Sequence, residues 1–539
     1  MKRNFIRINA LLLALMGLFG CSYSYLTPHG NINIPHERTA TLSAHAPFTD
    51  SIIQLWADKI IDDKKLSGKG NVPRIILAKL MLKKDLMETN TKIRRMIVSG
   101  VTGSSWALNK KGDYDFTLTP LTTILFLFGD QPEILYPETK DYLLKTLLTA
   151  DGNKYRSSAP RTLGLAPETE NHLLMTEGSR YLKNNWMKLH GSTDPYYNNI
   201  QNGMETKVLA LLAKINKEGL FEFNSQPYIG YTIAALLNLE AFGSEKVRSE
   251  ARNVLDYMNW CYAIGSYGLK HYPPMRRRYD KQHIQQLTTG YQSVFMKTWL
   301  SFTGISGYNK DIRNAEAHAL MGAAMPYRPA DKVVDLIFNK GADYFVKIGH
   351  GKKACPEIYA AGKKFLLSAG GANRGKNSLV VTRPICLFLD DKAEDLSSVF
   401  HIAGPGSDYM GWNNTGVYKD FACAAGPVSI PSSATLITKN ESWAIYSGKN
   451  NLLIAVHSEA DFGLIAIFAN INADVLLSNL RMLNPDNKLL KSEFQFPGGQ
   501  KLSYDVNAPK NKWVIVTVNG ALQNRNFDKW PLFDGDPKI

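Results

Sequence analysis

The chain has 539 residues, of which 44% are hydrophobic and 21% charged, and this composition excludes wholesale disorder. The chain is longer than a domain with a single hydrophobic core usually is, so two or three domains are expected. The formal net charge is +15 at pH 7. Such a surplus favours an anionic partner, for example nucleic acid, an anionic membrane or an acidic polysaccharide.

The N-terminus has the pattern of an export signal. Three basic residues precede the apolar run ALLLALMGLFG, which stops at Cys21. This run is too short to span a bilayer, which needs about 20 residues, but it suits the core of a signal peptide. Residues 1–20 are therefore predicted to be a signal peptide, and residues 21–45, which have little periodicity, a tether.

The ending LFGC resembles the signal of bacterial lipoproteins, in which cleavage leaves the Cys as a lipidated first residue. The resemblance implies that Cys21 carries a lipid anchor and that the protein is a bacterial membrane lipoprotein, periplasmic or on the cell surface. A plain secretory signal with an incidental Cys is the alternative. Export makes nucleic acid a poor partner for the positive charge, so an acidic polysaccharide is the better expectation.

From residue 46 to about residue 340, apolar residues follow helical spacing. PFTDSIIQLWADKII offers Thr49 or Asp50 as N-cap, with apolar residues on one face behind it. Other segments of this kind are ETKDYLLKTLL, METKVLALLAKI, YIGYTIAALLNLEAF, SEKVRSEARNVLDYMNWCYAIGSYG and YQSVFMKTWLSF. There is no strict sequence repeat, which argues against a solenoid of near-identical units.

Beyond about residue 340, short β-branched or aromatic runs alternate with turn residues, as in KFLLSAGG, SLVVTRPICLFL, FGLIAIFANI and KWVIVTVNG. Within SWAIYSGKNNLLIAVHS, residues Gly448 to Asn451 indicate a hairpin turn. Helices followed by strands predict two consecutive domains. We expect an (α/α) toroid over residues 46–340 and an antiparallel β-sandwich over residues 341–539.

Several familiar motifs are incomplete or absent. Gly370, Gly375 and Lys376 fit the spacing of a phosphate-binding loop, but Asn377 replaces the Ser or Thr, and a strand pattern follows where a helix should. No HExxH, paired-Cys or GxSxG pattern occurs. Apart from Cys21, four dispersed cysteines form no disulfide framework, although one bridge is possible. No cofactor and no metal are expected.

The segment ETENHLLMTEGSRYL places Glu170, Asn171 and His172 at the start of a predicted helix. Such residues at a helix start indicate either capping, with Thr169 or Asn171 as N-cap, or a functional site. A second segment, FEFNSQPYIGYT, contains Glu222 and puts two tyrosines, Tyr228 and Tyr231, three apart on one helical face. A third, YPPMRRRYDK, sets Arg276, Arg277 and Arg278 before Tyr279, either as a solvated basic loop or as part of a site.

These side chains together fit the β-elimination of a uronic-acid glycan. Removal of the C5 proton requires neutralisation of the neighbouring carboxylate, which an amide such as Asn171 or a guanidinium such as Arg278 can provide. The reaction then needs a base near C5 and an acid near O4, and His and Tyr can serve in these roles.

These segments, with CPEIYAAGKKFLLSAGG, resemble the polysaccharide-lyase superfamily that joins a helical toroid to an antiparallel β-sandwich, such as heparinase-like, chondroitin and alginate lyases. The resemblance implies catalytic roles for Asn171, His172, Tyr228 and Tyr231. It implies substrate contacts for Arg278 and Tyr279. Glu170 and Glu222, which lie in the same segments as the catalytic candidates, are also expected to bind substrate. A histidine at the sandwich rim, used by some relatives, would be either His350 or His401.

Two other functions stay open. Helical toroids also host glycoside hydrolases, which need two carboxylates, and Asp113 or Asp115 with Glu168 or Glu170 could supply them. The third possibility is a glycan-binding lipoprotein without catalysis. The fold alone cannot distinguish the lyase, the hydrolase and the glycan-binding protein. The side chains that meet in a substrate cleft would distinguish them.

Overall fold

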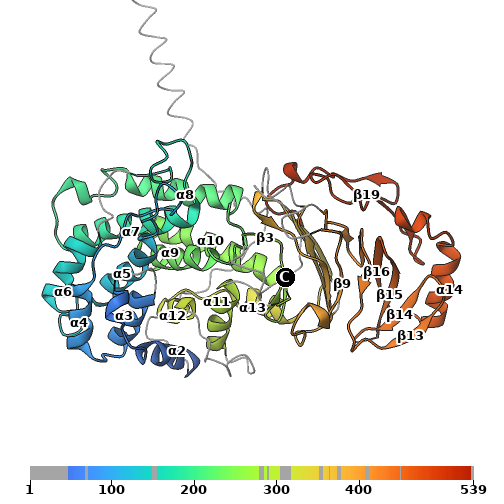
Figure 1. Ribbon diagram of the computed structural model, residues 1–539, viewed down its shortest axis with the longest axis horizontal. Helices are drawn as coiled ribbons and strands as arrows, with labels where there is room; N and C mark the ends of the chain where they lie inside the picture. The colour runs from blue at the N-terminus through green and yellow to red at the C-terminus, as the bar shows by residue number, and fades with distance from the viewer. Residues whose placement is uncertain are drawn as a thin grey trace, which may run out of the picture. The chain divides into compact units, whose positions relative to one another are not determined.

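The computed structural model describes residues 47–66, 71–148, 155–277, 285–287, 291–303, 317–350, 356–362, 364–372, 378–406, 412–449 and 451–535. A series of α-helices comes first and antiparallel β-sheets follow (Figure 1). This order confirms the predicted change from helices to strands. Cys21 and the predicted signal peptide and tether lie outside the described residues.

The helices of the first part, with their bounds, are α2 (Pro47–Ala57), α3 (Asn71–Met81), α4 (Leu86–Arg95), α5 (Asp115–Phe128), α6 (Pro137–Tyr142), α7 (Glu170–Leu189), α8 (Met204–Glu218), α9 (Ile229–Phe242), α10 (Glu245–Ile264), α11 (Tyr291–Leu300), α12 (Ala317–Ala324) and α13 (Asp331–Phe338). A π-helical turn, Leu143–Leu147, continues α6.

Helix α9 packs against α5, α7, α10 and α11 and is buried along nearly all of its length. Its polar Asn238 is satisfied within the helical core, because Nδ2 donates to the Thr119 carbonyl at 2.9 Å and Oδ1 accepts from Thr123 Oγ1 at 2.7 Å. The helix ends at Gly243, and Ser244 caps α10 by accepting from the Val247 backbone N–H. Helix α2, the first that the structure describes, packs against α12, the last helix but one of this part.

The strands are β1 (Ser266–Tyr267), β2 (Lys270–His271), β3 (Met275–Arg276), β4 (Tyr344–Ile348), β5 (Glu357–Gly362), β6 (Phe365–Gly370), β7 (Val380–Val381), β8 (Ile385–Phe388), β9 (Phe400–Ile402), β10 (Val417–Tyr418), β11 (Phe421–Ala424), β12 (Val428–Ser429), β13 (Leu436–Lys439), β14 (Ala444–Ser447), β15 (Leu452–Glu459), β16 (Phe462–Ala469), β17 (Glu493–Gln495), β18 (Lys501–Tyr504), β19 (Ile515–Val518) and β20 (Ala521–Leu522).

Two six-stranded antiparallel sheets dominate the second part. One has the strand order β12-β9-β8-β6-β5-β4 and the other β10-β11-β16-β15-β14-β13. One hydrophobic core includes residues of both sheets, for example Leu367 and Ile385 from the first and Ile454 and Leu464 from the second. The predicted hairpin at Gly448 to Asn451 is confirmed, since it joins the paired strands β14 and β15.

The helical and strand parts contact each other directly, and all described residues belong to one unit, residues 34–539. Strand β3, which follows α10, pairs with β7 through Met275↔Val381 and Arg276↔Val380. Nearby, the buried Arg383 donates to the Tyr272 hydroxyl at 3.2 Å. The strand part thereby fixes the backbone of Met275 and Arg276.

Some predicted boundaries were wrong. Helix α2 begins at Pro47, so Thr49 and Asp50 lie in its first turn and neither is the N-cap. A helix, α14 (Ala473–Leu483), interrupts the strand part after β16, where only strands were expected. Its N-cap is Asn472, whose side chain accepts from the backbone N–H groups of Asp474 and Val475.

Candidate functional site

Helices α5, α7 and α9 begin next to one another, and their first turns carry the candidate residues. Asp115 is the first residue of α5 and lies 2.7 Å from His172, the third residue of α7. The ring of Phe116 contacts both His172, with centroids 5.5 Å apart, and Tyr231 of α9, with centroids 4.3 Å apart. The N-terminal end of a helix carries partial positive charge, so this arrangement favours a negatively charged ligand.

Asn171 is not an N-cap. Helix α7 begins at Glu170 with Thr169 as N-cap, and Thr169 makes no side-chain capping bond. Asn171 Oδ1 instead accepts from the Thr169 hydroxyl at 2.5 Å, while its Nδ2 is buried and has no hydrogen-bond partner among the described residues. A buried donor left unpaired costs about 1–3 kcal/mol. This amide therefore has the donors that a ligand carboxylate would accept.

His172 is held in one orientation by Asp115. Its Nδ1 lies 2.7 Å from Asp115 Oδ2, and Asp115 Oδ1 accepts from the Gly103 backbone N–H at 3.0 Å. Burial lowers the pKa of His172, but the charge and hydrogen bond of Asp115, aided by Glu168 and Asp113, outweigh burial, so the net pKa is raised. With Nδ1 engaged, Nε2 is the nitrogen that can act as a base.

Three of the four acids proposed for a hydrolase, Asp113, Asp115 and Glu168, hold a loop instead. Asp113 accepts from the Ser105 backbone N–H at 2.8 Å, and Glu168 accepts from the Ser104 backbone N–H at 2.9 Å. Together with Asp115, which accepts from the Gly103 backbone N–H, these carboxylates hold residues 103–105 in place. Their occupied oxygens make them weak candidates for a catalytic pair.

Glu170 and Glu222 form a buried pair of carboxyl groups. Glu170 Oε1 accepts from the Glu222 backbone N–H at 2.7 Å and so holds this backbone in place. Burial raises the pKa of Glu170. Burial also raises the pKa of Glu222 to about 7, with Arg277 opposing and Glu170 adding to the shift. Glu222 Oε2 is buried and has no hydrogen-bond partner among the described residues.

Arg277 connects this pair to Tyr228. Its Nε lies 3.2 Å from Glu222 Oε1, and its Nη1 donates to the Tyr228 hydroxyl at 3.4 Å. Its backbone is left-handed, at φ 65°, and its N–H donates to the carbonyl of Leu379 in the strand part. The sequence favoured Arg278 over this neighbour. Arg278 and Tyr279 lie outside the described residues, so their predicted roles stay predictions.

The two tyrosines have different neighbours. Tyr228 precedes α9, as its N-cap, and contacts Arg277. Tyr231 lies inside α9, and its ring contacts Phe116 and His318 of α12, with a centroid separation of 4.9 Å for the histidine. The sequence placed both tyrosines on one helical face; in the structure Tyr228 is the N-cap of α9, its carbonyl accepts from the Tyr231 and Thr232 backbone N–H groups, and the two side chains have different neighbours.

His318 and Arg74 were not identified from the sequence. His318 is buried against Tyr231 and Tyr291, and burial, aided by the charge of Arg74, lowers its pKa well below 6.5. The guanidinium of Arg74, on α3, lies over the Tyr231 ring at 5.6 Å. Gly230 permits this packing, since a Cβ there would lie 2.8 Å from His318 Nε2. In the sequence, Gly230 is the one sign of this contact, because a glycine inside a helix can mark the close approach of another side chain.

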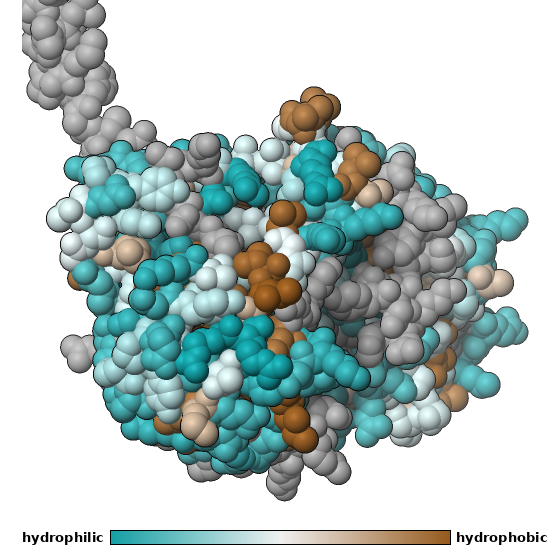
Figure 2. All heavy atoms as spheres, turned by 60° about the vertical axis from the view of Figure 1, so that its left-hand side comes forward, coloured by the Kyte–Doolittle hydropathy of each residue, from teal (hydrophilic) through white to brown (hydrophobic). Residues whose placement is uncertain are grey.

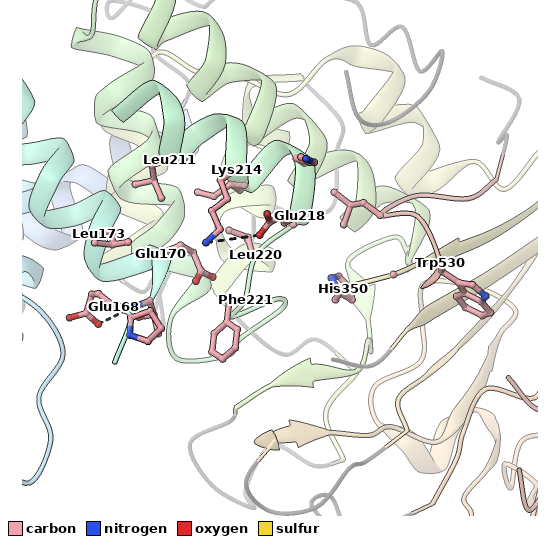
Figure 3. Close-up of a pocket in the computed structure, with 17 residues that line it drawn as sticks. Glu168, Glu170, Leu173, Leu211, Lys214, Glu218, Leu220, Phe221, His350 and Trp530 are labelled. Carbon is pink, nitrogen blue, oxygen red and sulfur yellow. Dashed lines mark hydrogen bonds and ion pairs between the residues drawn. The ribbon is translucent and has the colours of Figure 1, made fainter. Parts of the chain in front are cut away.

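A cleft of about 600 Å³ opens beside Glu170 (Figure 3). Its walls come from the start of α7, the last turns of α8, and segments of the strand part that include His350 and Trp530. The carboxylate of Glu170 points into the cleft, whereas Glu168 turns away from it. Lys214 and Glu218 of α8 line another side and lie 4.0 Å apart.

Of the two rim histidines, His350 lies at this cleft. Its ring stacks on Phe223 with centroids 4.1 Å apart, and Nε2 lies 2.6 Å from Glu357 Oε1, which leaves Nδ1 buried without a hydrogen-bond partner among the described residues. His401 sits in β9 opposite Cys386 and Ser429, within the sheet. The geometry therefore favours His350, a choice that the sequence left open.

Within the described ranges, no group of three or more His, Cys, Asp or Glu side chains is arranged to hold a metal ion. Cys261, Cys386 and Cys423 are free thiols, while Cys355 lies outside the described residues. Among the helices that the structure describes, none is long and apolar enough to cross a membrane. No family model matches the chain, and no curated protein matches it.

Proposed function

We propose that the protein is a polysaccharide lyase that cleaves an acidic, uronic-acid-containing glycan by β-elimination. The observation that carries the proposal is the buried, unpartnered Nδ2 of Asn171 beside His172, where three helices begin. A buried amide donor that no described residue satisfies is available to a ligand that can accept from it. A uronate carboxylate would accept from this amide and would be attracted by the positive helix ends.

The chemistry follows from the same geometry. Neutralisation of the carboxylate by Asn171 makes the C5 proton more acidic. The Nε2 of neutral His172 takes that proton, the electron pair forms the C4–C5 double bond, and the C4–O bond breaks. Tyr228, held by Arg277, or Tyr231 gives a proton to the departing oxygen. Because the pKa of His172 is raised, the rate should fall at low pH as this base becomes protonated.

The finer features of the fold and location belong to the same proposal. The contact between α2 and α12 supports a closed toroid of helices, and the core shared by the two six-stranded sheets supports a β-sandwich. A lipid on Cys21 would tether the protein to a bacterial membrane, facing the periplasm or the cell exterior. The net charge of +15 suits an acidic glycan.

The test is to incubate the protein with a panel of acidic polysaccharides and record the near-ultraviolet absorbance of a 4,5-unsaturated uronate. Asn171→Ala should lower the rate by about a hundredfold or more, as loss of one preorganised donor does, and leave stability nearly unchanged. The control is Asn472→Ala, which removes a true cap of α14. It should cost about 1 kcal/mol of stability and leave turnover intact. Full activity of a stable Asn171→Ala protein would contradict the proposal.

A glycoside hydrolase is the second candidate, because of one observation. Glu222, with a pKa of about 7, is partly protonated at neutral pH and lies next to Glu170. In such a pair, protonated Glu222 can act as the general acid and Glu170 as the second carboxyl group that a glycoside hydrolase needs. Glu170 was among the acids expected from the sequence, whereas Glu222 takes the place expected for Asp113 or Asp115. The same incubation separates the two functions, since a hydrolase releases reducing ends without the unsaturated chromophore.

A further inference from the structure

Two loops beside the candidate site expose leucines to solvent. They comprise residues 104–111, ahead of α5, and residues 155–167, ahead of α7, and we call them the leucine loops. Leu163 and Leu165 are 96% and 87% exposed, and Leu108 is 60% exposed. The face of the helical part shown in Figure 2 is hydrophilic over most of its area. Single exposed leucines are common, but a group of them on adjoining loops marks a binding surface.

The two loops hold each other in place. Trp106 Nε1 donates to the Pro160 carbonyl at 2.9 Å, and Arg161 Nη1 donates to the Leu108 carbonyl at 3.0 Å. A shallow hollow of about 540 Å³ is lined by both loops. Leu163 has a left-handed backbone, φ 54°, which is unfavourable for a bulky residue. The chain thus maintains a strained turn that directs this leucine outward.

The charged side chains on the leucine loops are all positive. Neither leucine loop contains an acidic residue, and the exposed charged side chains on them are Lys110, Lys111, Arg156 and Arg161. The nearest acids along the chain, Asp113 and Glu168, turn inward to accept from loop backbone N–H groups. An apolar tip surrounded by cations is complementary to hydrocarbon beneath anionic headgroups.

We propose that the leucine loops bind the surface of an anionic lipid bilayer. Leu163 and Leu165 enter the boundary of the acyl chains, and the basic side chains remain among the headgroup phosphates. A glycan would be bound by aromatic rings and hydrogen-bonding groups, whereas the exposed tips here are aliphatic. The inference does not depend on the proposed lyase activity or on a lipid at Cys21.

The experiment uses the full chain and tryptophan quenching by brominated acyl chains. Leu163→Trp is compared with Leu522→Trp, since Leu522 is 81% exposed on β20, away from the loops in sequence. Both proteins share the same apolar N-terminal run, so a difference between them reports the loop. With vesicles of phosphatidylcholine containing about 30% phosphatidylglycerol, the added tryptophan of Leu163→Trp should be quenched at least about twofold, and added salt should reverse this. Equal quenching in both proteins, or none in Leu163→Trp, would overturn the proposal.

A second comparison tests affinity. The Leu163→Ser, Leu165→Ser double variant should bind these vesicles about tenfold more weakly than the parent. Replacement of Lys110 and Lys111 by Glu should remove the preference for anionic over neutral vesicles. If the serine variant binds vesicles as the parent does but has lost binding to polysaccharide or to a protein partner, the loops serve that ligand and the lipid proposal is wrong.

Discussion

The change Glu222→Gln tests the buried carboxyl pair through protein stability. Burial raises the pKa of Glu222 from 4.5 to about 7, with Arg277 opposing and Glu170 adding to the shift. The unfolded chain titrates near the ordinary value. Because the folded pKa is the higher one, this group stabilises the fold fully below pH 4.5, and that stability is lost as the pH rises through about 7. At about 1.4 kcal/mol per pH unit, the loss is about 3 kcal/mol.

Glutamine has nearly the same shape and no proton to lose. The free energy of unfolding of Glu222→Gln, measured against that of the parent, should therefore rise by about 3 kcal/mol between about pH 4.5 and about pH 8. Urea unfolding at closely spaced pH values measures this difference. Glu218→Gln is the matched control, because its side chain is 59% exposed on the neighbouring α8.

The free energy of unfolding of Glu218→Gln should differ from that of the parent by an amount that does not depend on pH. A pH-independent difference for Glu222→Gln as well would refute the inference that Glu222 has a raised pKa. If the free energy of unfolding of Glu222→Gln falls relative to that of the parent as the pH rises, the ion pair with Arg277 lowers the pKa of Glu222 more than burial raises it. Either result would also remove the observation that favours a hydrolase.

Two further changes test other parts of the molecule. Gly230→Ala places a Cβ 2.7 Å from Tyr291 Cβ and 2.8 Å from His318 Nε2. Because this overpacks the core, the change should lower the free energy of unfolding by about 1–3 kcal/mol. A urea unfolding curve indistinguishable from that of the parent would contradict this. Cys21→Ser should release the protein from the membrane fraction of its host cell, and unchanged fractionation would argue against the lipid anchor.

The elements that sequence predicts well are those with a strong local period and a clear end. Helix α8 follows METKVLALLAKI and ends at Gly219, and the β14–β15 hairpin follows the turn at Gly448 to Asn451. Helix α14 shows the limit of this approach. Its ADVLLSNLRML pattern is amphipathic, but the strands on both sides of it favoured a continuous run of strands.

The site residues that sequence missed depend on contacts between distant segments. His318 meets Tyr231 only because α12 packs on α9, and no local pattern marks it. Arg277 and Arg278 are adjacent and chemically identical, so spacing cannot separate them. Pairing between β3 and β7 places Arg277, because it fixes the backbone just before this residue.

Under the proposed function, Asn171 and Glu222 affect uronate binding differently as the pH changes. The amide of Asn171 attracts a uronate at any pH, whereas an ionised Glu222 would repel it. Uronate binding should therefore weaken as the pH rises through about 7, while His172 works as a base only above its raised pKa. We expect a bell-shaped profile of kcat/KM whose alkaline limb disappears in Glu222→Gln and whose acidic limb persists. If the alkaline limb remains in that variant, Glu222 does not face the bound uronate.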